Sequence, residues 1–487
     1  MQTNSNHKIN IIIVGAGKAG ELIAGDILKN KQSPFNIIGF VDDDKNKIDI
    51  KVAGVRVIGV IENLKKLIKE NNIQELFIAI PSERGKIIRN IVEMTTGSRV
   101  IYKILPRLSE VLMQNFDEDY IKYIRRVKAE DLLGGEILKS DQNEISNYAN
   151  GKTILITGAA GSIGSELSRQ IAAHGAKKII LYDWWENGMF ELRNQLIENY
   201  PESRFEFIIG DIKDRNKINL VMAAYKPTTV FHAAAYKHVP LMESNPMEAI
   251  KNNILGTRIV AEVSINHKVD KFILISSDKA VNPTNIMGAT KRAAEKIIHI
   301  LSGNTQSNTV FCAVRFGNVI NSNGSAIPIF ERQIEKGGPV TVTDKEITRY
   351  FMTIPEAVHL VLQSWVMGLN NDLFVLDMGE PIKIYELAKL LIILQGYVPN
   401  EDIGIEITGL RPGEKLYEEV LIDQEQTQST AIEKVFRTKN YLNFDKENFL
   451  NNLDLMIDTI DEDGLNVGSL RDKLQEMIST YKPEKHS

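Results

Sequence analysis

Short apolar runs alternate with stretches of helical periodicity along most of the chain. The first apolar run covers residues 9–14, a glycine-rich turn follows at 15–20, and apolar positions then recur at the spacing of a helix face. Two more apolar runs, at 35–41 and 75–80, are separated in the same way. Because strands that alternate with helices favour a parallel sheet, we predict a small Rossmann-like nucleotide-binding-type domain over residues 1–105.

The same pattern restarts at residue 151, after a charged and less periodic segment. An apolar run at 153–156 leads into a turn that contains three glycines, at 157–164, and then into a predicted helix that begins near Ser165. Five further strands are predicted at 178–182, 206–209, 229–232, 271–276 and 309–314. This region therefore predicts a second, larger doubly wound parallel sheet.

The predicted fold class is α/β, with two Rossmann-like doubly wound parallel sheets and a small C-terminal substrate-binding part. After about residue 317 the strand-helix alternation gives way to turns, short strands and a helix near 355–366, as expected for a part that covers a substrate. The predicted boundaries are 1–105 for the N-terminal domain, 106–150 for a connector, 151–460 for the second domain and 461–487 for a tail. Within the second domain we predict a cofactor part at about 151–316 and a substrate part mainly at 317–425.

Composition narrows the classes of protein that fit this pattern. The chain has 487 residues and a formal net charge of -5 without long runs of one sign, which excludes the basic footprint of a nucleic-acid binder. The single cysteine, Cys312, lies in an apolar run and excludes a disulfide framework. The N-terminus is polar and no apolar run approaches a membrane span of about 18 residues. We therefore predict a soluble, cytoplasmic protein that binds small molecules, and we assign no metal site.

The second glycine turn contains Gly158, Gly161 and Gly164 between a predicted strand and a predicted helix. This spacing permits a tight turn, a close approach of the backbone to a pyrophosphate, and close packing of the helix. Asp183 ends the next strand, where a carboxylate can accept a hydrogen bond from an adenosine ribose. Such a carboxylate repels a 2′-phosphate, which favours NAD over NADP, although two lysines just before that strand leave NADP open.

Other residues of the turn and of the neighbouring strand ends complete the predicted cofactor site. Those after the third predicted strand suit an adenine edge, and the small residues after the fourth let the cofactor approach closely. The predicted set is Ala160, Ser162, Ile163, Asp211, Ile212, Ala233, Ala234 and Ala235.

The fifth of the strands in this fold ends in Ser277, Asp278 and Lys279, and Lys291 follows on a predicted helix. This arrangement resembles the extended short-chain dehydrogenase family, in which a strand-end serine or threonine is followed by a tyrosine, three residues and a lysine. Met287 stands at the tyrosine position. A thioether neither accepts nor donates a proton at useful pH, so we expect Met287 to shape the pocket. The resemblance implies that Lys291 also contacts the cofactor.

Four more segments narrow the resemblance: HAAAYKHVPLME at 232–243, NNILGT at 252–257, RFGN at 315–318 and RPGEK at 411–415. With the replaced tyrosine, they are similar to the CapD-type polysaccharide-biosynthesis dehydratases. These are nucleotide-sugar 4,6-dehydratases, and the chain most resembles those that make 4-keto-6-deoxy sugars from UDP-N-acetylglucosamine. The resemblance covers about residues 8–440. Large members usually begin with membrane helices, which this chain does not contain.

The resemblance implies oxidation at carbon 4 of the sugar, loss of water across carbons 5 and 6, and return of the hydride to carbon 6. NAD is expected to stay tightly bound because each turnover regenerates it. Ser277 is expected to orient the carbon 4 hydroxyl, and Lys291 to lower the local proton affinity. Lys279, with a pKa depressed by desolvation, is expected to remove the carbon 5 proton while Asp278 protonates the departing hydroxyl.

Substrate phosphates call for fixed positive charge and hydrogen-bond donors. The predicted substrate-binding residues are Lys237, His238, Asn253, Asn318, Arg349 and Arg411. Arg411 and Arg349 are predicted to clamp phosphates, Asn318 to meet the substrate pyrophosphate and Asn253 to meet the cofactor. His238 is expected either to border the sugar or to act as a hydrogen-bonded structural histidine.

Three other functions remain open from the sequence. A dehydratase that inverts carbon 5, or a nucleotide-sugar epimerase, belongs to the same superfamily, but both usually keep the tyrosine that Met287 replaces. The third hypothesis, a non-catalytic nucleotide sensor, belongs to a different functional class. We expect a homo-oligomer, a dimer or higher, by resemblance, and a regulatory or assembly part for the first domain, whose Gly15–Gly20 turn and Asp42 are compatible with a second nucleotide or none.

Overall fold

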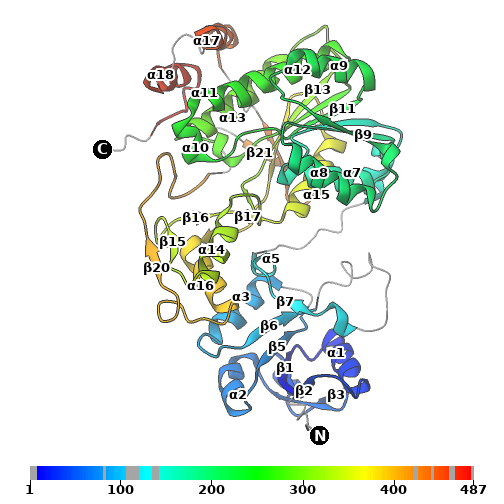
Figure 1. Cartoon of the computed structure of the whole chain (residues 1–487), viewed down its shortest axis with the longest axis vertical. Helices are drawn as coiled ribbons and strands as arrows, with labels where there is room; N and C mark the ends of the chain where they lie inside the picture. The colour runs from blue at the N-terminus through cyan, green and yellow to red at the C-terminus, as the bar shows by residue number, and fades with distance from the viewer. Residues whose placement is uncertain are drawn as a thin grey trace. The chain divides into compact units, whose positions relative to one another are not determined.

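The computed structural model describes residues 8–80, 84–105, 120–133, 142–419, 426–439, 444–459 and 467–483. The chain divides into two compact units (Figure 1). The first unit comprises Met1–Glu136, Ser325–Lys345 and Lys383–Thr408, and the second comprises Ile137–Gly324, Glu346–Ile382 and Gly409–Ser487. Among the described residues, no helix combines the length and apolar character that crossing a membrane requires.

The first unit is built on a sheet of seven strands in the order β3-β4-β2-β1-β5-β6-β7. These are β1 (Ile9–Val14), β2 (Phe35–Val41), β3 (Lys51–Val52), β4 (Val55–Gly59), β5 (Glu75–Ile78), β6 (Ile101–Ile104) and β7 (Arg125–Arg126). The central strands are parallel, and β3 and β7 are antiparallel to their neighbours at the two edges. The predicted parallel α/β pattern is confirmed.

The helices of the first unit come from distant parts of the sequence. They are α1 (Lys18–Lys29), α2 (Leu64–Glu70), α3 (Arg84–Met94), α5 (Ala129–Leu133), α14 (Ala326–Glu335) and α16 (Ile384–Leu394), with the paired strands β15 (Val340–Val342) and β20 (Ile405–Ile407). Three short 3-10 helices, η1 (Lys45–Lys47), η2 (Ile61–Asn63) and η3 (Tyr120–Tyr123), complete it. Helix α16 packs against α3, which brings these late segments into the first unit.

The second unit is built on a nine-stranded sheet in the order β10-β9-β8-β11-β12-β13-β18-β22-β21. The strands are β8 (Thr153–Thr157), β9 (Lys178–Asp183), β10 (Phe205–Ile209), β11 (Thr229–His232), β12 (Lys271–Ile275), β13 (Val310–Arg315), β18 (Asp372–Leu376), β21 (Gln426–Ser429) and β22 (Val435–Lys439). All pairs from β10 to β18 are parallel, and β22 and β21 extend the sheet antiparallel. The strand order reverses between β8 and β11, which is where a doubly wound sheet binds ligands.

Helices cover both faces of this sheet. The helices of the second unit are α6 (Gln142–Ala149), α7 (Ser162–Ala173), α8 (Glu186–Ile197), α9 (Arg215–Tyr225), α10 (Val239–Ser244), α11 (Pro246–Ala249), α12 (Thr257–Asn266), α13 (Ile286–Ser302), α15 (Ile354–Met367), α17 (Lys446–Thr459) and α18 (Val467–Met477). A π-helix, η5 (Ile250–Gly256), joins α11 to α12. The 3-10 helices are η4 (Glu202–Arg204) and η6 (Asp278–Ala280), and the short strands are β14 (Asn318–Val319), β16 (Thr348–Arg349), β17 (Phe351–Met352) and β19 (Ile382–Lys383).

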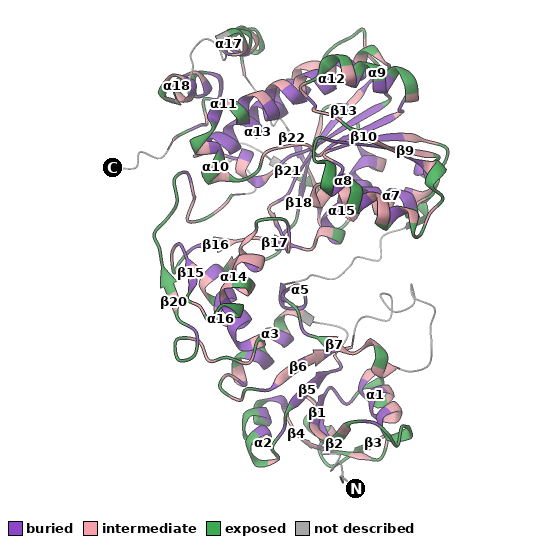
Figure 2. Cartoon of the chain, viewed as in Figure 1, coloured by how far each residue is buried: buried purple, intermediate pink, exposed green. Residues whose placement is uncertain are grey.

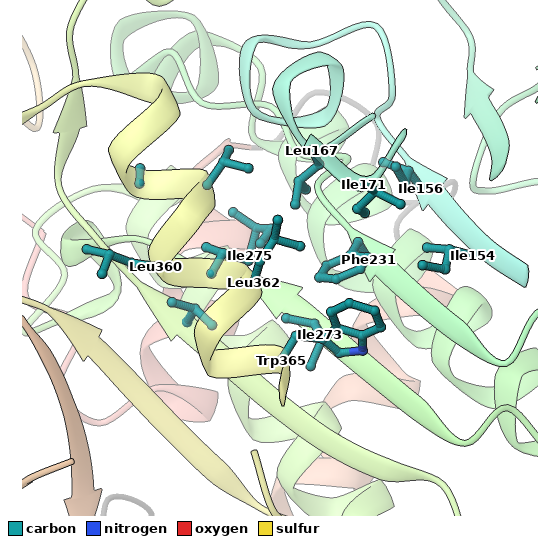
Figure 3. Packing of buried hydrophobic residues seen from close by; sticks show 14 of the residues in the cluster. Ile154, Ile156, Leu167, Ile171, Phe231, Ile273, Ile275, Leu360, Leu362 and Trp365 are labelled. Atoms are coloured by element: carbon teal, nitrogen blue, oxygen red, sulfur yellow. The ribbon is translucent and has the colours of Figure 1, made fainter. Parts of the chain in front are cut away.

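The main core of the second unit lies where α7 and α15 cover one face of the sheet (Figure 3). Leu167 and Trp365 come from these two helices, and Phe231 and Ile273 come from the strands; all four are fully buried. The Trp365 ring meets Phe231 edge to face at 5.3 Å. Burial of each such side chain stabilises the fold by roughly 1.5–3 kcal/mol, and Figure 2 shows the resulting buried strands. This packed layer holds the strand ends at fixed positions.

Candidate active site

The turn between β8 and α7 has the steric features expected of a phosphate-binding turn. Gly158 has φ +72°, and a Cβ there would lie 2.6 Å from the backbone nitrogen of Ala234. A Cβ on Gly164 would lie 2.0 Å from the carbonyl oxygen of Gly158. At Gly161, by contrast, a Cβ would meet only the Gly158 oxygen, at 3.3 Å. The glycines therefore bring backbone against backbone at both ends of the turn and leave its middle accessible to a ligand.

A cavity of about 790 Å³ opens beside this turn, in the second unit. Most of the predicted cofactor residues line it: Gly158, Gly161, Ser162, Ile163, Asp183, Ile212, Ala233, Ala234, Ala235 and Lys291. Ala160 and Asp211 are not brought to its wall. The N–H of Ala160 donates to Asp183, and the Asp211 carboxylate pairs with Lys213 at 2.7 Å. Trp184 and Trp185, which the sequence analysis did not single out, line the cavity next to Asp183.

Asp183 connects the glycine turn to the end of β9. Its Oδ2 accepts from the backbone N–H of Ala160 and its Oδ1 from that of Trp185, both at 2.9 Å. Burial raises the pKa of the Asp183 carboxyl, and these backbone donors oppose that rise. The carboxylate therefore fixes the turn and faces the cavity at once, as the predicted ribose contact requires.

Ser277, Asp278 and Lys279 follow β12 and are brought together as predicted. Ser277 caps η6, and its Oγ donates to Asp278 Oδ1 at 2.9 Å. Lys279 Nζ contacts Asp278 Oδ1 at 3.1 Å, Asn318 Oδ1 at 3.2 Å and Glu418 Oε2 at 3.0 Å. Asp278 is almost completely buried, with 1% exposure. A cation thus lies between two carboxyl groups at the edge of the cavity.

The pKa predicted for Lys279 is wrong in direction. Burial lowers the pKa of this ammonium as expected, but the adjacent Asp278 and Glu418 carboxylates outweigh burial and raise it. For Asp278, burial outweighs the neighbouring cation. Burial and the Glu418 charge raise the pKa of the Asp278 carboxyl, and Lys279 only partly offsets them. Asp278 is therefore a far weaker acid than an exposed aspartate, as a general acid near neutral pH must be.

Glu418 was not predicted from the sequence. Its Oε1 pairs with Arg349 Nε at 3.1 Å while its Oε2 pairs with Lys279. Burial alone would raise the pKa of Glu418, but Lys279 and Arg349 outweigh it and lower the pKa. Glu418 lies three residues after the RPGEK segment at 411–415. The charged residues that continue beyond this segment were the sequence feature that could have predicted it.

Lys291 and Met287 lie on α13, whose first turn is capped by Asn285 Oδ1, which accepts from Gly288 N at 2.7 Å. Lys291 Nζ donates to the carbonyl oxygen of Ile275 at 2.6 Å. Desolvation by burial lowers the pKa of Lys291 to about 8, although Glu295 opposes this shift. Met287 is buried and lines the cavity, in keeping with a role in its shape.

A buried ion cluster holds α13 against the strands that carry the site. Both oxygens of Glu295 accept from Arg315, each at 2.7 Å, and Arg292 lies 3.0 Å away. Ser276 Oγ also donates to Glu295, at 2.6 Å. Burial alone would raise the pKa of Glu295, but the two guanidinium groups lower it to about 2. The charges fix the register between α13, β12 and β13, and hence the separation of Lys291 from Ser277.

The remaining predicted substrate residues fall into two groups. Lys237, His238 and Asn318 line the main cavity, and with Arg349 and Arg411 they also line an adjoining cavity of about 200 Å³. Asn253 is not on either wall. It is buried, accepting from Tyr236 N at 2.8 Å and donating to Tyr236 O at 3.0 Å and Thr290 Oγ1 at 3.1 Å. Its position therefore indicates a role in holding the chain ahead of Lys237.

The 409–419 loop positions Arg411 and the glutamates. The Gly413 carbonyl oxygen accepts from Asn285 Nδ2 at 2.9 Å, and Gly413 has φ +74° with its Cα face close to Asn285. Arg411 N donates to Glu414 Oε2 at 3.1 Å. The loop is thus anchored at the first turn of α13. Within the described ranges, no group of histidine, cysteine and carboxylate side chains is arranged to hold a metal ion.

A glycine turn beside a cavity, with a serine, a carboxyl group and two lysines at the next strand end and helix, defines an enzyme of the extended short-chain dehydrogenase type. The sequence profile described as "Polysaccharide biosynthesis protein" matches residues 154–440, and one described as "CoA-binding domain" matches residues 1–106. The chain belongs to this family of polysaccharide biosynthesis proteins. The resemblance stated from the sequence is confirmed.

Individual relatives agree with this assignment. The capsular polysaccharide biosynthesis protein CapD of Staphylococcus aureus is 46% identical over 90% of this chain and 72% of its own length. A UDP-glucose 4-epimerase of Rickettsia rickettsii is 37% identical over 59% of this chain and 82% of its own. An inverting UDP-N-acetylglucosamine 4,6-dehydratase of Campylobacter jejuni is 34% identical over 65% and 90%. The crystal structure of Pen from Bacillus thuringiensis superposes with a TM-score of 0.56, at 32% identity, over 64% of this chain and 99% of Pen.

Proposed function

We propose that this protein is a nucleotide-sugar 4,6-dehydratase that converts UDP-N-acetylglucosamine to a UDP-linked 2-acetamido-2,6-dideoxy-4-keto hexose for surface polysaccharide or glycan synthesis. The observation that carries the proposal is the contact between Asp278 and Lys279 beside the cavity. Elimination of water needs a base and an acid that act on neighbouring carbons, and this pair supplies both. The named dehydratase of Campylobacter jejuni supports the choice of substrate.

The residues around the glycine turn fit a nicotinamide dinucleotide. The open middle of the turn at Gly161 admits a pyrophosphate, and Asp183 presents a carboxylate to the adenosine ribose. When bound, such a cofactor would accept the hydride from carbon 4 and return it to carbon 6. Asp183 favours NAD over NADP, because a 2′-phosphate beside a carboxylate is repelled.

Ser277 and Lys291 are assigned to the oxidation at carbon 4. The Ser277 hydroxyl lines the cavity and can orient the sugar hydroxyl, since it already donates to Asp278 and so leaves an oxygen lone pair free to accept. Lys291 has a pKa of about 8, so its charge is present at neutral pH. That charge stabilises a developing oxyanion and lowers the proton affinity of the site.

Asp278 and Lys279 are assigned to the elimination. Transfer of one proton across their 3.1 Å contact converts the ion pair to a neutral amine and a neutral carboxylic acid, the two forms that the reaction requires. The amine of Lys279 then takes the carbon 5 proton. Asp278 gives its proton to the carbon 6 oxygen, which leaves as water. The raised pKa of Asp278 favours this arrangement.

An epimerase is the second candidate, because the relative from Rickettsia rickettsii carries that name. Epimerisation at carbon 4 releases no water and gives an acid beside carbon 6 no role. The buried Asp278 carboxyl and the replacement of tyrosine by Met287 therefore favour dehydration. Of the retaining and inverting dehydratases, Met287 favours the one that retains the configuration at carbon 5. The configuration of the product distinguishes the two.

The test is to incubate the purified protein with UDP-N-acetylglucosamine in deuterated water and to follow the sugar by NMR, without and then with added NAD or NADP. We expect a 4-keto-6-deoxy product with deuterium at carbon 5, and couplings that give its configuration. Asp278→Asn is the matched control and should lose dehydration. Release of UDP-N-acetylgalactosamine instead would establish the epimerase, and an unchanged substrate under all conditions would reject both assignments.

A further inference from the structure

Two carboxyl groups from distant parts of the second unit, Asp278 and Glu418, flank the same ammonium group: Lys279 Nζ lies 3.1 Å from Asp278 Oδ1 and 3.0 Å from Glu418 Oε2. Their side chains are 0% and 5% exposed, so neither is solvated by bulk water. Asp278 Oδ1 accepts from Ser277 and Lys279. Among the described residues, no N–H or O–H donor reaches the buried Oδ2 of Asp278. Because two buried carboxylates beside a single ammonium repel each other, this arrangement favours a proton on one of the two groups.

The surrounding cations decide which group carries that proton. Each oxygen of Glu418 faces its own cation, with Arg349 Nε at 3.1 Å and Lys279 Nζ at 3.0 Å. Asp278 has a cation on one oxygen only. On its other side Asp278 Oδ2 faces the backbone of Gly317, where a Cβ would lie 2.8 Å away. Glu418 is therefore the permanent anion, and Asp278 is the member of the pair that holds the proton.

We propose that Glu418 is a positioning residue that keeps Asp278 in its acid form at neutral pH. The inference deepens the proposed dehydration and rests on it for its catalytic meaning. In the step concerned, the O–H bond of Asp278 breaks as the carbon 6 oxygen takes the proton, and the carbon 6 to oxygen bond breaks to release water. Lys279 takes the carbon 5 proton as the neutral amine, because it has first passed its own proton to the Asp278 carboxylate across their 3.1 Å contact. It returns that proton to carbon 5 when carbon 6 receives the hydride, and the proton released by the carbon 4 hydroxyl on oxidation replaces the one that Asp278 gives up.

Other charged groups around this pair come from three segments. Lys237 and His238 precede α10, Arg349 lies on β16, and the 409–419 loop contributes Arg411, Glu414, Lys415 and Glu419. Lys415 is close enough for its pKa to depend on Glu419, Glu418, Asp278 and Lys279, and Lys237 has its pKa lowered by burial and by Lys279. Neutralising Glu418 removes an anion that both Asp278 and Lys279 face. The pKa of both groups then falls, because an anion favours the protonated form of each neighbour.

The first test is the pH dependence of dehydration in Glu418→Gln, which keeps the size and the acceptor oxygen of the side chain. We expect the whole profile to move toward lower pH by about one unit or more, with a loss of about tenfold at pH 8 and a much smaller loss at pH 6. Glu418→Asp should restore most of the wild-type profile. Glu198→Gln, a change of the same kind on the exposed end of α8, should leave it unchanged.

A purely structural role for Glu418 makes a different prediction. It would lower activity by the same factor at every pH, with a matching fall in Tm, and the profile would keep its position. That result, or a wild-type profile in Glu418→Gln, overturns the proposal.

A second measurement does not depend on the substrate. Infrared difference spectra of the protein, recorded over a pH titration, should contain a carboxylic acid C=O band that disappears in Asp278→Asn and titrates at lower pH in Glu418→Gln. If the wild type shows this band but leaves UDP-N-acetylglucosamine unchanged, the proposed function fails and the proton-holding role of Glu418 stands. If no band depends on Asp278, the role of Glu418 is rejected whatever the enzyme does.

Discussion

The two glycine turns, one in each unit, are built in nearly the same way. A Cβ on Gly20 would lie 2.1 Å from the Gly15 oxygen, just as one on Gly164 would lie 2.0 Å from the Gly158 oxygen. In both turns a carboxylate from the end of the next strand accepts from a backbone N–H of the turn. The distances are 2.7 Å for Asp42 and 2.9 Å for Asp183. The backbone of the turn therefore does not distinguish the two units.

The difference lies in the side chains around each turn. In the first unit both oxygens of Asp42 also contact Lys47, at 3.1 and 3.0 Å, so this carboxylate is neutralised within the protein. In the second unit the neighbouring strand ends present Ser277, Asp278 and Lys279 to a cavity. Glycine spacing thus predicts a strand-turn-helix connection. The residues that follow the other strands indicate whether the unit has a catalytic site. We propose that the first unit serves regulation or assembly.

The largest expected contrast is between lysines. Lys279→Met should lower the rate of dehydration by roughly 10³-fold, since the base at carbon 5 is removed. Lys47→Met, the matched change beside the first turn, should leave the rate within about twofold. Both are measured by product formation under saturating substrate. A comparable loss in the two variants would mean that the first unit takes part in the reaction, and the comparison would fail.

The middle glycines give a second contrast. A Cβ on Gly17 would meet nothing within 4 Å, and one on Gly161 would meet only the Gly158 oxygen, at 3.3 Å, a contact that a small shift of this carbonyl relieves. Gly161→Val should reduce retained dinucleotide by roughly 10- to 100-fold, because the side chain occupies the space that a pyrophosphate needs. Gly17→Val should retain the wild-type content. Cofactor content is measured after denaturation, and equal losses would count against the assignment of the second turn.

The carboxylates give the smallest effects. Asp183→Asn should shift the preference between NAD and NADP toward NADP by roughly tenfold, because the charge that repels a 2′-phosphate is removed. Asp42→Asn should leave that preference unchanged and lower the free energy of unfolding by about 1–2 kcal/mol through its weakened bonds to Ala16 and Lys47. Cofactor titrations and thermal unfolding separate the two. A change of preference in Asp42→Asn would reverse the roles of the turns.

Much of the architecture could be predicted because it depends on local pattern. The apolar runs that predicted strands at 153–156, 178–182, 206–209, 229–232, 271–276 and 309–314 match β8 to β13 within a residue or two. Ser277, Asp278 and Lys279 were predicted together because they follow one strand. The later strands β18, β21 and β22 were not predicted. The last two pair antiparallel at the sheet edge, where periodicity is weak.

What could not be predicted depends on contacts between distant residues. Glu418 lies 139 positions from Lys279 along the chain and meets it only in the folded unit. The contact with Glu418 helps to raise the pKa of Lys279. A prediction that considers burial without this contact therefore gives a shift in the opposite direction. Asn253 was predicted to meet the cofactor, but its amide is committed to Tyr236 and Thr290. The pKa of Lys279 and the role of Asn253 thus depend on their partners in the folded unit more than on residue type.

The last two helices determine where a stable fragment that contains the second unit can end. The family profile ends at residue 440, but Phe449, Leu453, Leu474 and Tyr481 beyond it are buried with Met287 and other residues of α13. Figure 1 shows α18 beside α11 and α13, and α17 beside α18. A fragment that stops at the profile boundary would leave an apolar strip of α13 open to solvent, inviting aggregation and proteolysis. A fragment meant to contain the whole second unit should therefore extend through residue 483.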